Sequence, residues 1–164
     1  MIDAQIYSRA AAVLKAFRAH GWTLATAESC TGGLVAGALT ALPGSSDVVD
    51  RGFVTYSNAA KMSMLGVPEA VLVAHGAVSE ETARAMAQGA CKAAGVDAAV
   101  SITGIAGPGG GSTGKPIGLV HFACALKNGR ISHHKMCFGE LGRDEVRRAA
   151  ILVALDMLDE AART

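Results

Sequence analysis

Apolar residues recur along this chain with two different periods. At helical spacing they fall on one face of residues 4–19, for example at Ile6, Val13 and Phe17. Short apolar runs bounded by Gly, Pro, Asn or Asp predict strands instead. The predicted helices span residues 4–19, 32–42, 58–65, 79–95 and 143–162, with a short segment continuing to about residue 75; the predicted strands span 22–27, 52–57, 97–104, 117–126 and 131–138.

The order of these elements predicts an α/β fold. Strands alternate with helices over most of the chain, which is typical of a sheet covered by helices on both faces. Asn128-Gly129 between the last two predicted strands is a strong hairpin signal, so these strands should be antiparallel. We therefore expect a single three-layer α/β/α domain over residues 1–164, with a mixed, mostly parallel sheet that ends in an antiparallel hairpin.

Composition and charge narrow the class of protein. With 164 residues, 51% of them hydrophobic, the chain is long enough for one domain with a substantial core. Fifteen Lys and Arg nearly balance fourteen Asp and Glu, so we expect no nucleic-acid partner. No apolar run reaches the roughly 18 residues of a membrane span, and we expect no membrane association and a cytoplasmic location. Four widely spaced cysteines favour reduced thiols over a disulfide framework.

The segment Ala27-Glu28-Ser29-Cys30-Thr31-Gly32-Gly33 joins a predicted strand to a predicted helix. Unpaired N–H groups and positive potential at a helix start could hold an anion, or the oxyanion formed when Ser29 attacks a carbonyl. The alternative is that Ser29 or Thr31 only caps the helix and the glycines only allow close packing. Cys30 is an alternative nucleophile, because a helix start lowers the pKa of a thiol.

Lys61 follows shortly after a predicted strand. A lysine in such a place is usually a solvated surface residue. The other interpretation is a general base, because a desolvated lysine can take a proton from a serine without any histidine. None of the five histidines shows the spacing of a helical zinc pair, so we expect no metal.

Residues 104–115 form a glycine-rich segment that nearly matches two nucleotide-binding motifs, G-x-G-x-x-G and the Walker A loop. Both motifs require a following helix, whereas here Pro116 and a strand follow, so we exclude both. The segment is either a surface loop or, through its backbone amides, a wall that contacts a phosphate or a sugar.

Three arginines, Arg143, Arg147 and Arg148, begin the last predicted helix. Arginine near a helix start opposes the dipole preference, and a bound anion would explain it. For Arg147 and Arg148, a solvated face paired with Asp144 and Glu145 explains the pattern equally well.

Three motifs of this chain, Ala27–Gly33, Tyr56–Lys61 and Thr103–Gly110, together resemble the CinA C-terminal domain family. Members of that family act as nicotinamide-nucleotide amidohydrolases. The resemblance implies hydrolysis of nicotinamide mononucleotide (NMN) to nicotinate mononucleotide and ammonia in pyridine nucleotide recycling. It also implies a small-molecule nucleotide substrate, no cofactor and a homo-oligomer, a dimer or larger.

The resemblance assigns roles to particular residues. Ser29 would be the nucleophile, Lys61 its base, and Tyr56 would assist the proton transfer. The residues expected to bind or orient the substrate are Thr31, Gly32, Thr103, Gly104, Gly107, Gly109, Gly110 and Arg143. Two alternatives stay open: a nucleotide-binding or regulatory module without turnover, associated with competence or DNA-damage responses, and an amidase for another small amide.

Overall fold

A five-stranded sheet forms the middle layer of the molecule. The computed structural model describes residues 2–164, and its sheet has the order β2 (Val49–Val54), β1 (Leu24–Glu28), β3 (Ala98–Gly104), β4 (Leu119–Leu126) and β5 (Ile131–Cys137). β1 pairs in parallel with both β2 and β3, whereas β3 with β4 and β4 with β5 are antiparallel. Only β4 therefore runs against the other strands of this sheet, which confirms the predicted mixed, mostly parallel sheet with its terminal hairpin.

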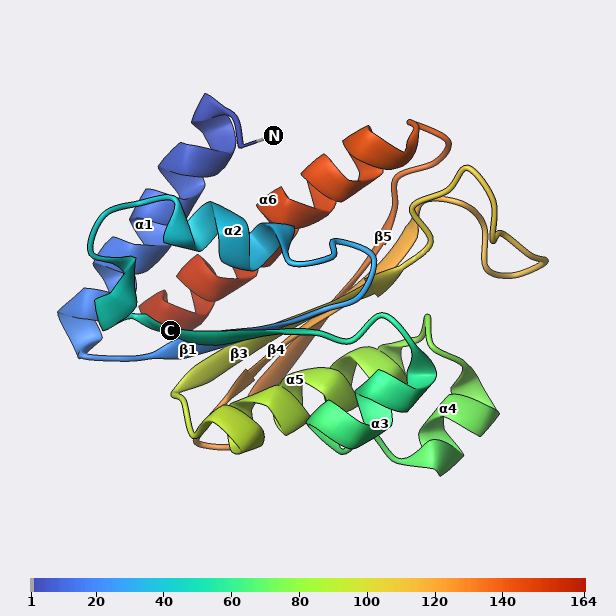
Figure 1. Ribbon diagram of the computed structural model, residues 1–164, viewed down its shortest axis with the longest axis horizontal. Coiled ribbons are helices and arrows are strands. Elements are labelled where there is room, and N and C mark those ends of the chain that lie inside the picture. Colours follow the sequence, from blue (N-terminus) through green and yellow to red (C-terminus); the bar gives the residue numbers. More distant parts are fainter. Residues whose placement is uncertain (1) are drawn as a thin grey trace.

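Helices cover both faces of the sheet (Figure 1). The helices α1 (Ala4–His20), α2 (Leu34–Thr40) and α6 (Arg143–Arg163) lie on one face, and α3 (Asn58–Leu65), α4 (Glu69–His75) and α5 (Glu80–Ala94) lie on the other. Successive residues of a strand point to opposite faces. Val100 of β3 therefore packs in the first core, with Phe17 and Leu155, and Ala99 packs in the second, with Met86. The α/β/α layering is confirmed.

The observed boundaries of β2 and of the helix after it, α3, differ from the predicted ones. The second strand begins at Val49, one residue beyond the short 3₁₀ helix η1 (Ser45–Asp47) and its cap Val48, and it ends at Val54 rather than at residue 57. This strand lies at an edge of the sheet and is largely exposed, so its apolar pattern is weak. The cap of α3 is Ser57, whose hydroxyl accepts a hydrogen bond from the Ala60 amide, so the expected Asn58 cap was wrong by one residue.

The parallel strands bring three segments together at one edge of the sheet. Glu28 at the end of β1 is in register with Val54 of β2 and with Ile102 of β3. Ser29, the segment leading to Lys61 and the glycine-rich loop all follow these strand ends. In open α/β sheets, the carboxyl ends of the strands are where ligands bind. Across residues 2–164, no helix is both long and apolar enough to cross a membrane.

Candidate active site

Ser29 and Lys61 meet at the carboxyl edge of the sheet. The Ser29 amide donates to the Ile102 carbonyl, which continues the pairing of β1 with β3 by one residue. The Nζ of Lys61, on α3, lies 3.2 Å from Ser29 Oγ and donates a hydrogen bond of 2.9 Å to the Thr55 carbonyl. Because Lys61 is only 1% exposed, its interpretation as a solvated surface residue is wrong.

The surroundings of Lys61 favour the neutral amine. No carboxylate forms an ion pair with it within the described residues. Burial disfavours the charged ammonium and lowers the pKa of Lys61 from its usual value. A neutral amine at hydrogen-bond distance from a hydroxyl has the geometry of a general base beside its nucleophile.

Cys30, the alternative nucleophile, lies beside this pair and is 6% exposed. Burial raises the pKa of its thiol to about 11, and the nearby negative charge of Glu28 acts in the same direction. Since the thiolate is the nucleophilic form of cysteine, this environment suppresses the reactivity of Cys30 near neutral pH.

The pair opens into a pocket of about 280 Å³. The residues that line it come from the ends of β1 and β3, from α3 and from the loops around them: Ser29, Cys30, Tyr56, Lys61, Ala77, Val78, Thr103, Gly104, Ile105, Ala106, Gly107, Gly109, Gly110 and Arg143. Most of the residues named from the sequence thus surround one cavity. Thr31 and Gly32 do not line it, and their part in substrate binding stays a prediction.

Arg143 and Tyr56 lie together in this lining. Arg143 donates from Nη1 to the Gly107 carbonyl and from Nη2 to the Tyr56 hydroxyl, both at 3.0 Å. Because a guanidinium has five N–H donors, Arg143 keeps donors for an anion. Tyr56 is 61% exposed and its hydroxyl contacts Arg143 rather than Ser29 or Lys61, so its part in proton transfer stays a prediction.

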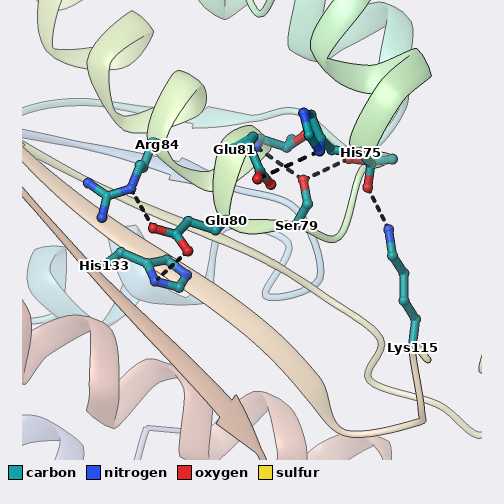
Figure 2. A network of polar contacts seen from close by, with 9 residues as sticks. His75, Ser79, Glu80, Glu81, Arg84, Lys115 and His133 are labelled. Atoms are coloured by element: carbon teal, nitrogen blue, oxygen red, sulfur yellow. Dashed lines mark hydrogen bonds and ion pairs between the residues drawn. The ribbon is translucent and has the colours of Figure 1, made fainter.

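The turn between α4 and α5 forms another wall of the pocket, through Ala77 and Val78. The buried Thr103 hydroxyl donates to the Ala77 carbonyl at 2.6 Å and so ties this turn to β3. Lys115 of the glycine-rich loop donates to the His75 carbonyl at the end of α4, at 2.6 Å (Figure 2). These contacts hold two walls of the pocket against each other.

Sequence reasoning missed Glu28. Its carboxylate is fully buried and accepts hydrogen bonds from the amides of Val35 and Ala36 in the first turn of α2. Glu28 therefore caps this helix, and the interpretation of Ser29 or Thr31 as the cap was wrong. The signal in the sequence was an acidic residue at the end of a buried strand, directly before a turn of small residues.

Two left-handed glycines complete the turn. Gly32 has φ +59° and Gly33 has φ +98°, backbone conformations that residues with a Cβ rarely adopt. The chain therefore reverses sharply between Ser29 and α2, which leaves Ser29 at the pocket. Over residues 2–164, no group of three or more His, Cys, Asp or Glu side chains is placed to hold a metal ion.

Fold and site together define an α/β domain with a buried serine–lysine pair at the carboxyl edge of its sheet. The chain belongs to the CinA C-terminal domain family, whose model matches residues 6–162. It is 51% identical over 158 residues to the nicotinamide-nucleotide amidohydrolase PncC of Escherichia coli (strain K12), a match that covers 96% of this chain and 95% of that protein.

Two further relatives place the domain in context. A CinA-like protein of Syntrophobacter fumaroxidans is 52% identical over 142 residues, which is 86% of this chain but 33% of that longer protein. The crystal structure of the competence/damage inducible protein CihA from Agrobacterium tumefaciens superposes with a TM-score of 0.96 at 51% identity, covering 100% of this chain and 99% of that one. The family expected from the three motifs is confirmed.

Proposed function

We propose that this protein is a nicotinamide-nucleotide amidohydrolase that converts NMN and water into nicotinate mononucleotide and ammonia. The similarity to PncC over nearly the full length of both chains supports the substrate and the reaction. The observation that carries the mechanism is the 3.2 Å separation of Lys61 Nζ from Ser29 Oγ in a pocket.

The first half of the reaction transfers the acyl group to Ser29. Neutral Lys61 accepts the hydroxyl proton while Ser29 Oγ forms a bond to the carboxamide carbon. The tetrahedral intermediate then collapses, its C–N bond breaks, and Lys61 returns the proton to the leaving nitrogen, which departs as ammonia. The product of this step is a nicotinoyl ester of Ser29.

The second half releases the acid. A water molecule attacks the ester carbon and gives its proton to Lys61, which then protonates Ser29 Oγ as the C–O bond breaks. Nicotinate mononucleotide leaves and both side chains return to their starting state.

The oxyanion of the tetrahedral intermediate requires hydrogen-bond donors other than the backbone amides at the start of α2. Glu28 already occupies the amides of Val35 and Ala36, and the Leu34 amide donates to the Thr31 carbonyl. In the part of the chain that the structure describes, the amides of Cys30 and Thr31 have no acceptor. We assign the oxyanion to the Cys30 amide, because Cys30 lines the pocket next to the nucleophile whereas Thr31 is fully buried outside that lining.

Other residues of the pocket lining would hold the nucleotide. The free N–H donors of Arg143 and the amides of the loop through Gly107, Gly109 and Gly110 suit the 5′-phosphate. Binding energy from the phosphate would position the carboxamide at Ser29. We further propose that the protein acts in the cytoplasm as a homo-oligomer.

The experiment that tests this function is ammonia release from NMN by the purified protein. Ser29→Ala should abolish turnover, whereas Cys30→Ala, the neighbouring change, should keep most of it. Binding of NMN without ammonia release would instead indicate the regulatory module. Faster release from nicotinamide or another small amide would indicate a different amidase, and loss of turnover in EDTA, restored by zinc or magnesium, would contradict the metal-free mechanism.

A further inference from the structure

We infer that Glu28 is a positioning residue: its buried carboxylate fixes the turn that presents Ser29 to Lys61. Glu28 does not line the pocket, so it acts through Ser29 and not on the substrate. The inference rests on the proposed function where it concerns turnover of NMN. The rate at which a probe modifies Ser29 tests it without any substrate.

Glu28 accepts four hydrogen bonds, two at each carboxylate oxygen. Oε1 accepts from the Thr31 hydroxyl at 2.7 Å and from the Val35 amide at 2.9 Å. Oε2 accepts from the Thr26 hydroxyl at 3.1 Å and from the Ala36 amide at 3.0 Å. With an exposed fraction of 0%, the carboxylate is out of contact with bulk solvent.

These contacts enclose Ser29 from both sides along the chain. Thr26 belongs to β1, before the nucleophile, whereas Thr31 and α2 come after it. One side chain thus joins the strand, the turn and the helix around Ser29. The turn itself contains the left-handed Gly32 and Gly33, whose wide conformational freedom gives it little rigidity of its own. The carboxylate supplies the constraint that the glycines lack.

Replacement by glutamine would leave a specific mismatch. The amide of Gln has one acceptor oxygen and one NH₂ group, which can only donate. In either orientation, the NH₂ group would face one hydroxyl and one backbone N–H of α2. The hydroxyl can rotate to accept, but the backbone N–H cannot, so the first turn of α2 must move. Misplacement of a reacting group by about 1 Å can cost about a hundredfold in rate.

Asp97 provides the control, because its carboxylate also accepts hydrogen bonds from the backbone and the hydroxyl of one residue next to a strand. Asp97 accepts from the Thr23 amide at 2.8 Å and from the Thr23 hydroxyl at 3.3 Å. Thr23 lies just before β1 and Asp97 just before β3, at the amino ends of these strands, whereas Ser29 follows the carboxyl end of β1. Asp97→Asn therefore disturbs a carboxylate that ties the same strand to the fold but lies far along it from Ser29. A purely structural role for Glu28 predicts similar behaviour of the two variants.

The test compares Glu28→Gln with Asp97→Asn by three measurements: the melting temperature, kcat and KM for NMN, and the rate at which a fluorophosphonate probe modifies Ser29, followed by mass spectrometry. We expect Glu28→Gln to lower both kcat and the rate of Ser29 modification at least about tenfold, with KM changed less than about threefold. Asp97→Asn should change neither rate, whatever its melting temperature.

A Glu28→Gln protein that is less stable but keeps both rates, assayed well below its melting temperature, would overturn the inference. If Glu28→Gln does not fold, Thr26→Val replaces it in the test. This variant removes one hydrogen-bond donor from Glu28 Oε2 and leaves the pocket lining unchanged. An unchanged kcat and an unchanged rate of Ser29 modification in Thr26→Val would also overturn the inference. A wild-type protein that releases no ammonia from NMN would refute the proposed function, while the probe rates would still test Glu28.

Discussion

At the scale of single residues, the site depends on a lysine that is buried with no counter-ion among residues 2–164. An unpaired charge in the interior is costly, and a lysine in such a place tends to give up its proton. Lys61 is 1% exposed, and the oxygen atoms near its Nζ belong to a hydroxyl and a carbonyl. A titratable group whose pKa is shifted by burial, beside a nucleophile in a pocket, is a common property of active sites.

If Ser29 and Lys61 act as one unit, their mutational effects cannot add. Ser29→Ala and Lys61→Ala should each lower kcat at least about a hundredfold, because loss of either group removes the activated nucleophile. The double variant should be little slower than the slower single variant. Steady-state kinetics of the three proteins check this, with circular dichroism as the control for folding. Losses that multiply would place Lys61 in substrate binding.

The pH dependence of the reaction follows from the direction of the lysine's shift. Lys61 works as a base only when neutral, and burial lowers its pKa, so the active fraction rises with pH through a pKa below the ~10.4 of a free lysine. A plot of kcat/KM against pH for NMN should show this ascending limb. A limb centred near 10.4, or a rate that falls with rising pH, would contradict the assignment.

Arg143 offers a test of how the phosphate is held. Arg143→Ala should lower kcat/KM for NMN by roughly ten- to a hundredfold more than for the riboside that lacks the phosphate, because a charge-assisted contact is lost. Arg148→Ala is the matched control on the same helix, since Arg148 pairs with Asp3 at 2.6 Å instead of lining the pocket. Equal losses on both substrates would place Arg143 in another role.

Single residues also show how far the sequence could lead. Ser29 and Lys61 lie in recognisable motifs, and the structure brings them within 3.2 Å. Glu28 could not be predicted in the same way, because its partners are two, three, seven and eight residues away and converge only once α2 has formed. Burial of Lys61 was equally hidden, since it depends on how α3 packs and not on the local pattern.

At the scale of elements, the long helices and the hairpin have strong local signals, and their predicted positions agree well with the structure. The edge strand β2 and the short helix α2 have weak signals, and their predicted boundaries were displaced. The Ser79 cap with Glu80 and Glu81 begins α5 where expected, and Asn128-Gly129 lies between β4 and β5. α2 is only seven residues long and starts at Leu34, two residues later than predicted, because Gly32 and Gly33 belong to the turn. Tertiary contacts, above all with Glu28, decide such a short helix.

The loop that follows β3 is an element whose position depends on few side chains. Lys115 ties it to the His75 carbonyl at the end of α4 (Figure 2). Ala77 and Val78, which line the pocket, follow His75 closely in the chain. Lys115→Ala should loosen this loop, raise KM for NMN about two- to fivefold and leave kcat nearly unchanged, because one hydrogen bond of modest worth is removed. Hydrogen exchange of residues 105–118 should quicken. The unchanged exchange of this segment in the variant would show that Lys115 does not hold it.

At the scale of the whole molecule, the sheet separates two cores, and one of them lies beside a pair of titratable side chains. The face covered by α5 contains polar groups as well as small apolar side chains, and the buried His121 of β4 lies there beside His133 of β5. His121 Nδ1 is 2.9 Å from His133 Nε2, so one nitrogen must donate and the other must accept. Protonation of both rings would place two N–H groups against each other.

This histidine pair predicts a loss of stability in mild acid. Burial is the main cause that lowers the pKa of both rings, and it outweighs the opposite effect of Glu80, which lies 3.7 Å from His133. As the pH falls below the ~6.5 of an unfolded histidine, the unfolded chain binds protons that the folded protein does not. The contribution to stability is therefore complete above about pH 6.5 and is lost as the pH falls through the lowered folded-state values.

The melting temperature of the wild-type protein should accordingly fall between pH 7 and pH 5, and His133→Gln should reduce that slope because it removes one titrating ring and the paired nitrogen. Each kcal/mol of stability lost would lower the melting temperature by about 2–4 °C in a domain of this size. His134→Gln is the matched control, since His134 is the next residue of β5, is exposed and points to the opposite face. Equal slopes in the wild type and in His133→Gln would show that the acid sensitivity of this fold arises from other groups, the carboxylates first among them.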